Sequence, residues 1–405
     1  MTETSPALNR VKQGDLCAGC GGCAAVAPGK VAMRTVTPGY LRPVQKAPLS
    51  TLEEDTITAI CPGLGQKVDA AGRTDDTLWG PYVAMHTGHA TDEAVRHAGS
   101  SGGALSMMLA HLVADGVVDA VIQTAASPTL AIGNMTVITT DMAGITLAAG
   151  SRYAPSAPLE DLPKQCATGK RFAFVGKPCD VAALRALQAR DPKLAKQIPV
   201  LLSFFCAGVP SHAGGRAVLK ALDTDINQTQ AFRYRGNGWP GTATATLKDG
   251  TTRTMSYHDS WGGILSKHVQ HRCKICADGT GMAADIVCAD AWESDAAGYP
   301  VFSEAPGISL IVARTALGAQ LINAARNMKR ITTEDFDVST LAGIQPGQRE
   351  RRRALRARLI GRRLAGKPIP AYQGLHLRAA GKQNTLLRNL KNAAGMLRRS
   401  LKARV

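Results

Sequence analysis

The chain has 405 residues, of which 45% are hydrophobic and only 4% aromatic, a composition within the range of soluble globular proteins. This length is enough for two or three domains with cores of their own. The sequence has no uninterrupted apolar run of about 18 residues, which argues against a membrane span, and its polar first residues lack the apolar core of a signal peptide. We therefore expect a cytoplasmic protein.

The net charge of +17 is concentrated near the C-terminus. Residues 349–405 contain seventeen Lys and Arg residues and a single acidic residue, Glu350, so the rest of the chain is almost neutral. Leu, Ile and Ala recur with roughly helical spacing over residues 351–363 and 385–401. We predict a basic helical tail over residues 345–405 that is separate from the body of the protein.

The first part of the chain, residues 1–75, is interrupted by Gly and Pro and carries the first group of cysteines. From about residue 79, amphipathic stretches alternate with short apolar runs that are typical of buried strands. The spacing predicts a helix over 104–115, opened by Ser100-Ser101-Gly102-Gly103 and ended by Gly116. A strand is predicted over 117–122.

The same alternation continues through the second half of the chain. Predicted strands cover residues 171–176, 198–205, 284–288 and 309–312, and predicted helices follow Lys177, Ser211 and Thr315. Residues 242–248 and 251–257 flank Asp249-Gly250, which is the strongest short β-hairpin signal in the sequence. The pattern predicts an α/β core with a mixed sheet, in which this hairpin is the antiparallel part. We divide the core into residues 76–160 and 161–335.

The ten cysteines of a cytoplasmic chain indicate metal or redox chemistry rather than disulfides. Cys17, Cys20 and Cys23 lie in a glycine-rich loop, where three thiolates and nearby backbone N–H groups can converge on one iron–sulfur cluster. Ferredoxin-type sites add a cysteine followed by proline, and we predict that Cys61, which precedes Pro62, is this fourth ligand. The alternative is a zinc site, although zinc sites usually combine two Cys-x-x-Cys pairs.

A second set of cysteines is more scattered along the chain. Cys273 and Cys276 form a Cys-x-x-Cys pair, while Cys179 and Cys206 each follow the carboxyl end of a predicted core strand. Ligands collect at that edge of α/β sheets, so the four thiols can form a second cluster site. The spacing leaves open the alternative that Cys206 is a core residue and that Cys273 and Cys276 bind zinc.

Two further motifs carry weaker signals. Ser100, Ser101, Gly102 and Gly103 at a helix N-terminus offer free N–H groups to a phosphate, although similar residues begin many ordinary helices. Trp239, in Asn237-Gly238-Trp239-Pro240-Gly241, can line a flat cofactor or simply pack inside a turn.

A series of short motifs follows in order along residues 12–330. They are Gly88-His89-Ala90-Thr91-Asp92, Gly99-Ser100-Ser101-Gly102-Gly103, Gly150-Ser151-Arg152-Tyr153, Val175-Gly176-Lys177-Pro178-Cys179, Phe205-Cys206-Ala207-Gly208, Tyr234-Arg235-Gly236-Asn237-Gly238-Trp239-Pro240-Gly241, Arg272-Cys273-Lys274-Ile275-Cys276-Ala277-Asp278, Ala284-Asp285-Ile286 and Asp290-Ala291-Trp292. In these motifs the chain resembles the coenzyme F420 hydrogenase/dehydrogenase β-subunit family, which includes ferredoxin-dependent chlorophyllide reductases.

The resemblance implies a flavin-binding α/β core with FAD and one or two [4Fe–4S] clusters. It implies that the Ser100–Gly103 turn contacts the FAD phosphates, and it assigns ligands to a core cluster (Cys179, Cys206, Cys273, Cys276) and to an outer cluster (Cys17, Cys20, Cys23, Cys61). Electrons from a ferredoxin-like donor would pass through the clusters to FAD and on to a small-molecule acceptor. His89 and Lys177 are candidate catalytic proton donors. The family says nothing about the tail.

The basic tail supports two other hypotheses. A zinc-containing protein could use it to neutralise nucleic-acid phosphates, but the tail has one aromatic residue, Tyr372, and no recognisable nucleic-acid-binding module. We favour an amphipathic basic helix that binds an anionic membrane surface, at the inner face of the membrane, or a partner protein. Either role is compatible with an oxidoreductase.

Overall fold

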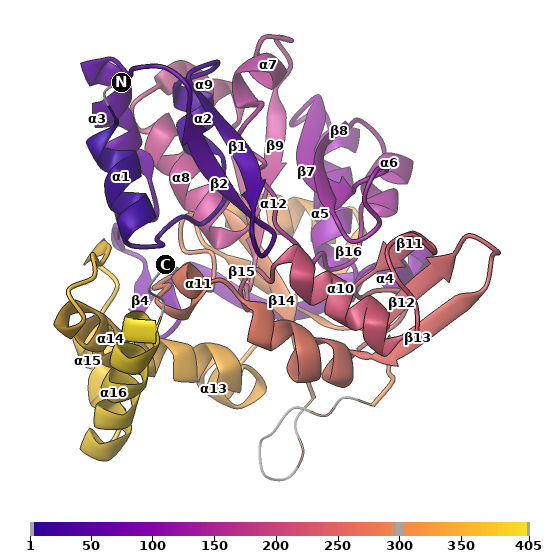
Figure 1. Ribbon diagram of the computed structural model, residues 1–405. Helices are drawn as coiled ribbons and strands as arrows, with labels where there is room; N and C mark the ends of the chain where they lie inside the picture. Colours follow the sequence, from indigo (N-terminus) through magenta and orange to yellow (C-terminus); the bar gives the residue numbers. More distant parts are fainter. Residues whose placement is uncertain (1–3, 294, 296–300, 302, 403–405) are drawn as a thin grey trace.

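The computed structural model describes residues 4–293, 295, 301 and 303–402, so the first three residues of the N-terminal segment and the last three of the tail lie outside it. Within the described residues, the largest sheet has eight strands in the order β16-β6-β15-β14-β10-β9-β7-β8 (Figure 1). β14, β10, β9 and β7 pair in parallel, and the other pairs are antiparallel. The predicted mixed α/β sheet is therefore confirmed.

The strands of this main sheet are β6 (Ala84–Ala90), β7 (Ala120–Ala126), β8 (Asn134–Thr139), β9 (Phe172–Val175), β10 (Val200–Phe204), β14 (Ile286–Asp290), β15 (Ser309–Ala313) and β16 (Ile331–Asp335). Helices α4 (Glu93–Ala98), α5 (Ala104–Ala114), α6 (Met142–Leu147) and α12 (Ala316–Asn327) cover one face, and α7 (Leu162–Cys166), α8 (Pro178–Gln188), α9 (Pro192–Gln197) and α13 (Leu341–Ile344) cover the other. Phe174 packs on the second face and its neighbour Ala173 on the first. The central strands β9, β10, β14 and β15 are buried along almost their whole length because both of their faces are covered.

The predicted helix starts agree with the structure. Ser211 caps α10 (His212–Ala221) by accepting a hydrogen bond from the backbone N–H of Gly214, and Thr315 caps α12 in the same way. α8 begins directly after Lys177. The strand predicted over 117–122 begins later, at Ala120, because a turn follows α5.

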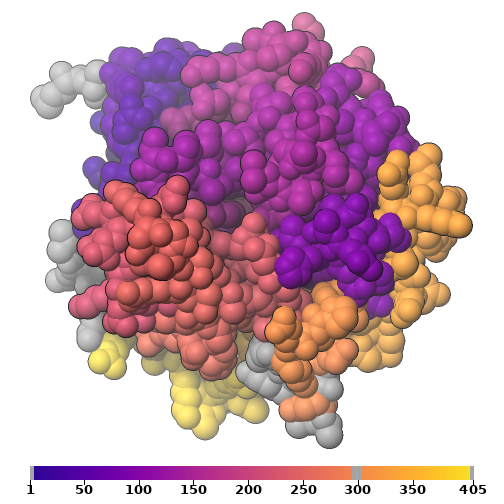
Figure 2. Space-filling view, turned by 90° about the vertical axis from the view of Figure 1, so that its right-hand side faces the viewer, coloured from indigo at the N-terminus to yellow at the C-terminus, as the bar shows by residue number. Residues whose placement is uncertain are grey.

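The predicted hairpin forms, but its expected place in the main sheet is wrong. β12 (Thr242–Leu247) and β13 (Thr252–Ser256) join β11 (Thr229–Arg233) in a separate three-stranded sheet. Along β12 the Ala and Leu side chains are buried while the Thr side chains are partly exposed. The central strands of the main sheet are covered on both faces, whereas the alternation along β12 provides only one apolar face. The small sheet packs against α10, η1 (His258–Ile264) and η2 (Leu265–His268), and in Figure 2 this region (salmon) borders the segment around α5 to β8 (purple).

The N-terminal segment contains α1 (Pro6–Gln13), α2 (Gly22–Val26), β1 (Val31–Val36), β2 (Tyr40–Gln45), α3 (Thr51–Ile60), β3 (Gly65–Lys67), β4 (Thr74–Asp76) and β5 (Gly80–Tyr82). The C-terminal region contains η3 (Val338–Thr340), α14 (Pro346–Leu364), β17 (Ala371–Gln373), α15 (Leu377–Lys382) and α16 (Leu386–Lys402). Between them in sequence lies the short α11 (His271–Lys274). These three parts share one apolar cluster, which includes Leu8, Cys17, Ile275, Leu355 and Met396.

The tail is therefore not separate from the body, in contrast to the prediction. β17 pairs in parallel with β3 of the N-terminal segment, although no strand was expected in this region. Two arginines of α14, Arg352 and Arg362, are almost completely buried. No helix in the described part of the chain has both the length and the apolar character needed to cross a membrane.

This packing predicts a stability difference within one helix. Leu355→Ala removes a fully buried side chain and should lower the free energy of unfolding by roughly 2–5 kcal/mol. Leu364→Ala, at the end of the same helix, changes a side chain that is 70% exposed and should stay within about 0.5 kcal/mol of the original protein. Urea unfolding followed by circular dichroism measures both values. Equal stability of the two variants would mean that α14 is not part of the core.

Candidate functional site

The outer cysteine group consists of Cys17, Cys20, Cys23 and Cys61, the four residues predicted to hold one cluster. They come from the loop before α2, from α2 itself and from the residue that ends α3. All four line one small cavity of about 30 Å³, which apolar side chains of α1, α3, β1 and α8 close. The structure thus brings the predicted ligands of the outer site together.

Backbone N–H groups surround these sulfur atoms. The N–H of Gly19 donates to Cys17 Sγ over 3.3 Å, and the N–H of Gly22 approaches Cys20. Gly21, between the two, has a φ of +85°, and a Cβ at this position would come within 2.7 Å of the Glu160 nitrogen. Glycine is therefore required here, and N–H groups near thiolates are characteristic of iron–sulfur sites.

Burial raises the pKa of every thiol in the outer group. The pKa of Cys17 rises to about 11 because the thiol is buried, although Arg42 partly offsets this effect. Burial also raises the pKa of Cys20, and the neighbouring Cys61 raises it further. Buried thiols that oppose one another's ionisation in this way lose their protons readily only to a bound cation. The donor set therefore fits a metal centre.

The core cysteine group consists of Cys179, Cys206, Cys273 and Cys276. Cys179 lies in the first turn of α8, directly after β9, and Cys206 follows β10, so both lie at the carboxyl edge of the parallel strands. The pKa of Cys206 rises to about 12, chiefly because the thiol is buried and next because Cys273 lies nearby, while Arg351 partly offsets the rise. Burial also raises the pKa of Cys179, with smaller contributions from its neighbours, Cys206 and Cys276 among them. The four predicted residues thus share one buried environment.

The spacing of the thiols in each group bears on the kind of metal centre that the group could hold. Among the described residues, no three His, Cys, Asp or Glu side chains lie close enough together to hold one metal ion. A zinc ion draws its sulfur ligands to about 2.3 Å from one point. The four thiolates of a [4Fe–4S] cluster each bind a different iron atom, so they surround the cluster at wider spacing.

Helix α8 lies between the two cysteine groups. Its residue Cys179 belongs to the core group, and Ala183, one turn later, lines the cavity of the outer group. The carboxylate of Asp180, on the same helix, acts on the pKa of both Cys20 and Cys179. The groups are therefore neighbours across one helix.

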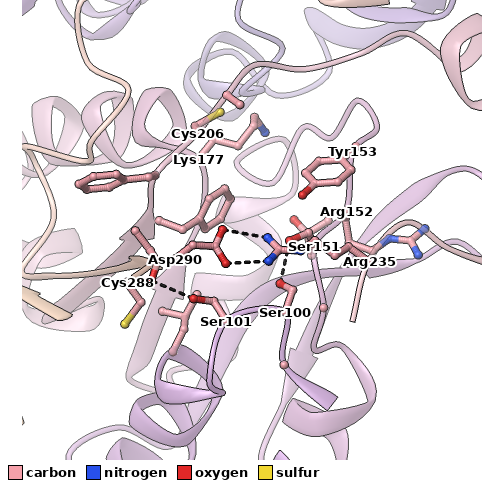
Figure 3. Close-up of a pocket in the computed structure, with 18 of the residues that line it drawn as sticks. Ser100, Ser101, Ser151, Arg152, Tyr153, Lys177, Cys206, Arg235, Cys288 and Asp290 are labelled. Carbon is pink, nitrogen blue, oxygen red and sulfur yellow. Dashed lines mark hydrogen bonds and ion pairs between the residues drawn. The ribbon is translucent and has the colours of Figure 1, made fainter. Parts of the chain in front are cut away.

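A larger cavity of about 280 Å³ opens at the same edge of the sheet (Figure 3). The first turn of α5, strand β7 and the segments after β9, β10 and β14 form its walls. Small-molecule and cofactor sites typically measure roughly 300–1,000 Å³ and favour this edge of α/β sheets. Cys206 of the core group is one of the residues that line the cavity.

An ion pair forms one wall of this cavity. Arg235 binds Asp290 through two hydrogen bonds of 2.9 and 2.7 Å, and its guanidinium lies over the rings of Tyr257 and Trp292 at 4.5 and 5.1 Å. Burial lowers the pKa of Arg235, but Asp290 raises it more, so the guanidinium stays charged. The wall is therefore a packed set of aromatic rings around a guanidinium whose charge Asp290 balances.

Lys177 is a second cation in the cavity wall and lies beside Cys206 in Figure 3. Its ammonium is 2.7 Å from Asp180 Oδ2 and 2.7 Å from Ser156 Oγ. Burial lowers the pKa of Lys177, but Asp180 and Cys179 raise it more, so the net shift is upward. Of the two predicted proton donors, Lys177 borders the cavity. His89 lies on β6 opposite Thr332 and is not among the lining residues.

The structure places only some of the predicted cofactor residues at the cavity. Ser100, Ser101 and Gly103 line the cavity, with Ser100 Oγ 2.7 Å from Ser151 Oγ. Gly102 is not a lining residue; a Cβ there would come within 2.8 Å of the Gly307 oxygen.

Trp239 is buried behind the wall. Its ring stacks on Trp292 with 4.8 Å between the centroids, and its N–H donates to Asp290 Oδ1. It supports the cavity without lining it. The sequence motifs contained Arg235 and Asp290 but gave no reason to pair them. The available signal was an aspartate at the carboxyl end of a core strand.

Together, the doubly covered sheet, the edge cavity and the two cysteine groups define an α/β protein with a candidate cofactor site at the carboxyl edge of its sheet. The comparisons with known proteins name its family. For the β subunit of coenzyme F420 hydrogenase/dehydrogenase, the model of the N-terminal part matches residues 85–162, and the model of the C-terminal part matches residues 169–339. The chain belongs to this family, which is one of oxidoreductases.

A solved structure supports the fold. A chain of the xenon-derivatised F420-reducing [NiFe] hydrogenase complex from Methanosarcina barkeri is 18% identical, with a TM-score of 0.55, and the match covers 69% of this chain and 91% of that chain. At this identity the likeness concerns the fold alone. Among curated proteins, no sequence matches this chain.

Two cysteine variants should differ in the amount of iron that they bind. Cys61→Ser should lower the iron bound after anaerobic reconstitution by about half, because one of the two predicted [4Fe–4S] clusters would lose a ligand. Cys166→Ser is the matched control, since Cys166 lies in α7 and belongs to neither group. Iron and sulfide determination measures both. Full iron content in Cys61→Ser would exclude Cys61 as a ligand.

Proposed function

We propose that this protein is an iron–sulfur flavoprotein oxidoreductase that passes electrons from a one-electron donor to an organic acceptor. [4Fe–4S] clusters held by the outer and core cysteine groups would supply one-electron transfer, and FAD in the edge cavity would supply two-electron chemistry. The observation that carries the proposal is the position of Cys206. It belongs to the core cysteine group and also lines the cavity.

The residues of the chain suit successive roles in this proposal. The outer group, which lies in the N-terminal segment, is the proposed point at which a ferredoxin-like donor delivers electrons. The core group lies one helix away and borders the cavity. Tyr257 and Trp292 line the wall of the cavity, Ser100 and Ser101 lie before the N-terminus of α5, which favours phosphate, and Lys177 holds a proton at its Nζ.

A purified sample tests the proposal most simply. After anaerobic reconstitution with iron, sulfide and FAD, the protein should be brown, and acid should release both iron and flavin. Ser106→Phe places a ring into the cavity from α5 and should lower flavin content while iron content stays unchanged; Ser106→Ala is its control. A colourless protein that contains zinc would refute the proposal. Reduced ferredoxin as donor and coenzyme F420, named in the family's description, as one acceptor would begin the assay panel.

A specific surface favours a second role for the C-terminal region. On α16, Leu386, Leu387 and Leu390 are 76, 63 and 57% exposed, while Met396 and Ser400 face the protein. Arg and Lys side chains lie beside this apolar stripe on the same helix. An exposed apolar stripe edged by cations is typical of helices that lie on anionic membranes. We propose that α16 holds the protein at such a surface.

Vesicle sedimentation tests this second role. The full-length protein should sediment with vesicles of phosphatidylglycerol and phosphatidylcholine, and added salt should weaken the association. Replacing Leu386, Leu387 and Leu390 together by Glu should reduce the bound fraction at least fivefold. Leu147→Glu, a change at an equally exposed leucine of α6, should leave it unchanged. Equal binding of the triple variant and the original protein would exclude the stripe as the contact, and binding of an acidic protein without vesicle binding would assign the surface to a protein partner.

A further inference from the structure

One arginine lies between the two cysteine groups. Arg272 is in α11, directly before Cys273 of the core group, and is only 1% exposed. Its Nη2 donates a hydrogen bond of 2.7 Å to the carbonyl oxygen of Pro62, the residue after Cys61 of the outer group. Arg272 therefore connects the backbone of one group to the backbone of the other.

The charge of Arg272 acts on thiols of both groups. It lowers the pKa of Cys61 in the outer group and of Cys276 in the core group, although burial, the largest effect, raises both. Burial lowers the pKa of Arg272 itself, but Tyr372 and the core cysteines raise it more. The side chain thus remains a cation within electrostatic range of both sites.

This cation lacks the partners that a buried guanidinium normally has. Within the described residues, no carboxylate forms an ion pair with Arg272, and its Nε and Nη1 have no hydrogen-bond partner. The ring of Tyr372 lies 5.9 Å from the guanidinium carbon, and Tyr372 is the neutral side chain that acts most strongly on the pKa of Arg272. Burying a charge with so few partners is destabilising, and further hydrogen-bond acceptors or a nearby anion would offset this cost.

Two other buried arginines show how the chain usually offsets this cost. Arg314 donates to the carbonyl oxygens of Trp79, Pro81 and Thr280. Arg352 donates to three carbonyl oxygens in the same manner. Arg272 has only one such bond and leaves two nitrogens without a partner, whereas Arg314 and Arg352 each leave one. The cysteines of the core group lie close enough to act on the pKa of Arg272.

We infer that Arg272 is a positioning residue for the electron path: its free N–H groups bond to sulfur of the clusters, and its charge raises their reduction potentials. The inference rests on the proposed function, because the nearby anions would be the cysteine-bound clusters. One-electron reduction adds a negative charge to a cluster, and a fixed cation nearby stabilises the reduced state more than the oxidised state. Hydrogen bonds to cluster sulfur act in the same direction.

Two substitutions separate the charge from the hydrogen bonds. Arg272→Gln removes the charge and keeps an N–H donor, whereas Arg272→Lys keeps the charge and loses the planar fork. Arg314→Gln is the matched control, since Arg314 is equally buried and no cysteine is among the groups that act on its pKa. Each full-length protein is reconstituted anaerobically, analysed for iron and titrated while the reduced clusters are followed by electron paramagnetic resonance.

In Arg272→Gln, the midpoint potential of at least one cluster should fall by about 59 mV or more, which is a tenfold change in the one-electron equilibrium. Arg272→Lys should stay closer to the original protein in potential but change the shape of the resonance signal, and Arg314→Gln should match the original in both. Unchanged potentials in Arg272→Gln, or an equal fall in Arg314→Gln, would overturn the inference. If Arg272→Gln binds no iron, the test passes to Arg272→Lys. A midpoint potential equal to that of the original protein supports the role of the charge, and a fall of about 59 mV or more overturns it. Absence of iron in the original protein would instead refute the proposed function.

Discussion

Guanidinium groups of the C-terminal helix α14 donate hydrogen bonds to the backbone of the loops that carry the core cysteine group, and the arrangement of this group depends on them. Arg351 donates to the Cys206 oxygen, Arg358 to the Lys274 oxygen and Arg352 to the Ala277 oxygen. These carbonyls lie outside the sheets, and a buried carbonyl without a donor costs about 1–3 kcal/mol. The arginines replace the regular hydrogen bonds that such loops lack, and they also place positive charge around a buried site that would bind anionic clusters.

The positions of the cysteine groups follow from the same edge of the sheet. β9 and β10 run in parallel and end side by side, which places Cys179 and Cys206 together and opens the cavity next to them. The N-terminal segment then packs its own four cysteines on the far side of α8. Arg272 occupies the space between the groups. The outer group, the core group and the cavity therefore follow one another across α8. This order suits the proposed stepwise electron transfer.

Much of the fold could be predicted because the main sheet is covered on both faces. Runs such as residues 171–176 and 309–312 are apolar throughout, and caps such as Ser211 and Thr315 mark where helices begin. The cysteine groups could also be expected, since spacing and strand ends are local signals. The tail could not, because its arginines bind carbonyls that are distant in sequence, and a charged helix read alone resembles a solvated one. The pair of Arg235 and Asp290, 55 residues apart, was hidden for the same reason.

The two proposed iron–sulfur clusters would lie next to each other across α8. Electron paramagnetic resonance of the fully reduced, reconstituted protein measures this proximity, because two paramagnetic clusters at short distance couple magnetically. We expect a broadened, spin-coupled signal that becomes a simple, uncoupled signal when Cys61 is replaced by Ser and only the core cluster is left. A single uncoupled signal from the original protein, or zinc bound in place of iron, would contradict it.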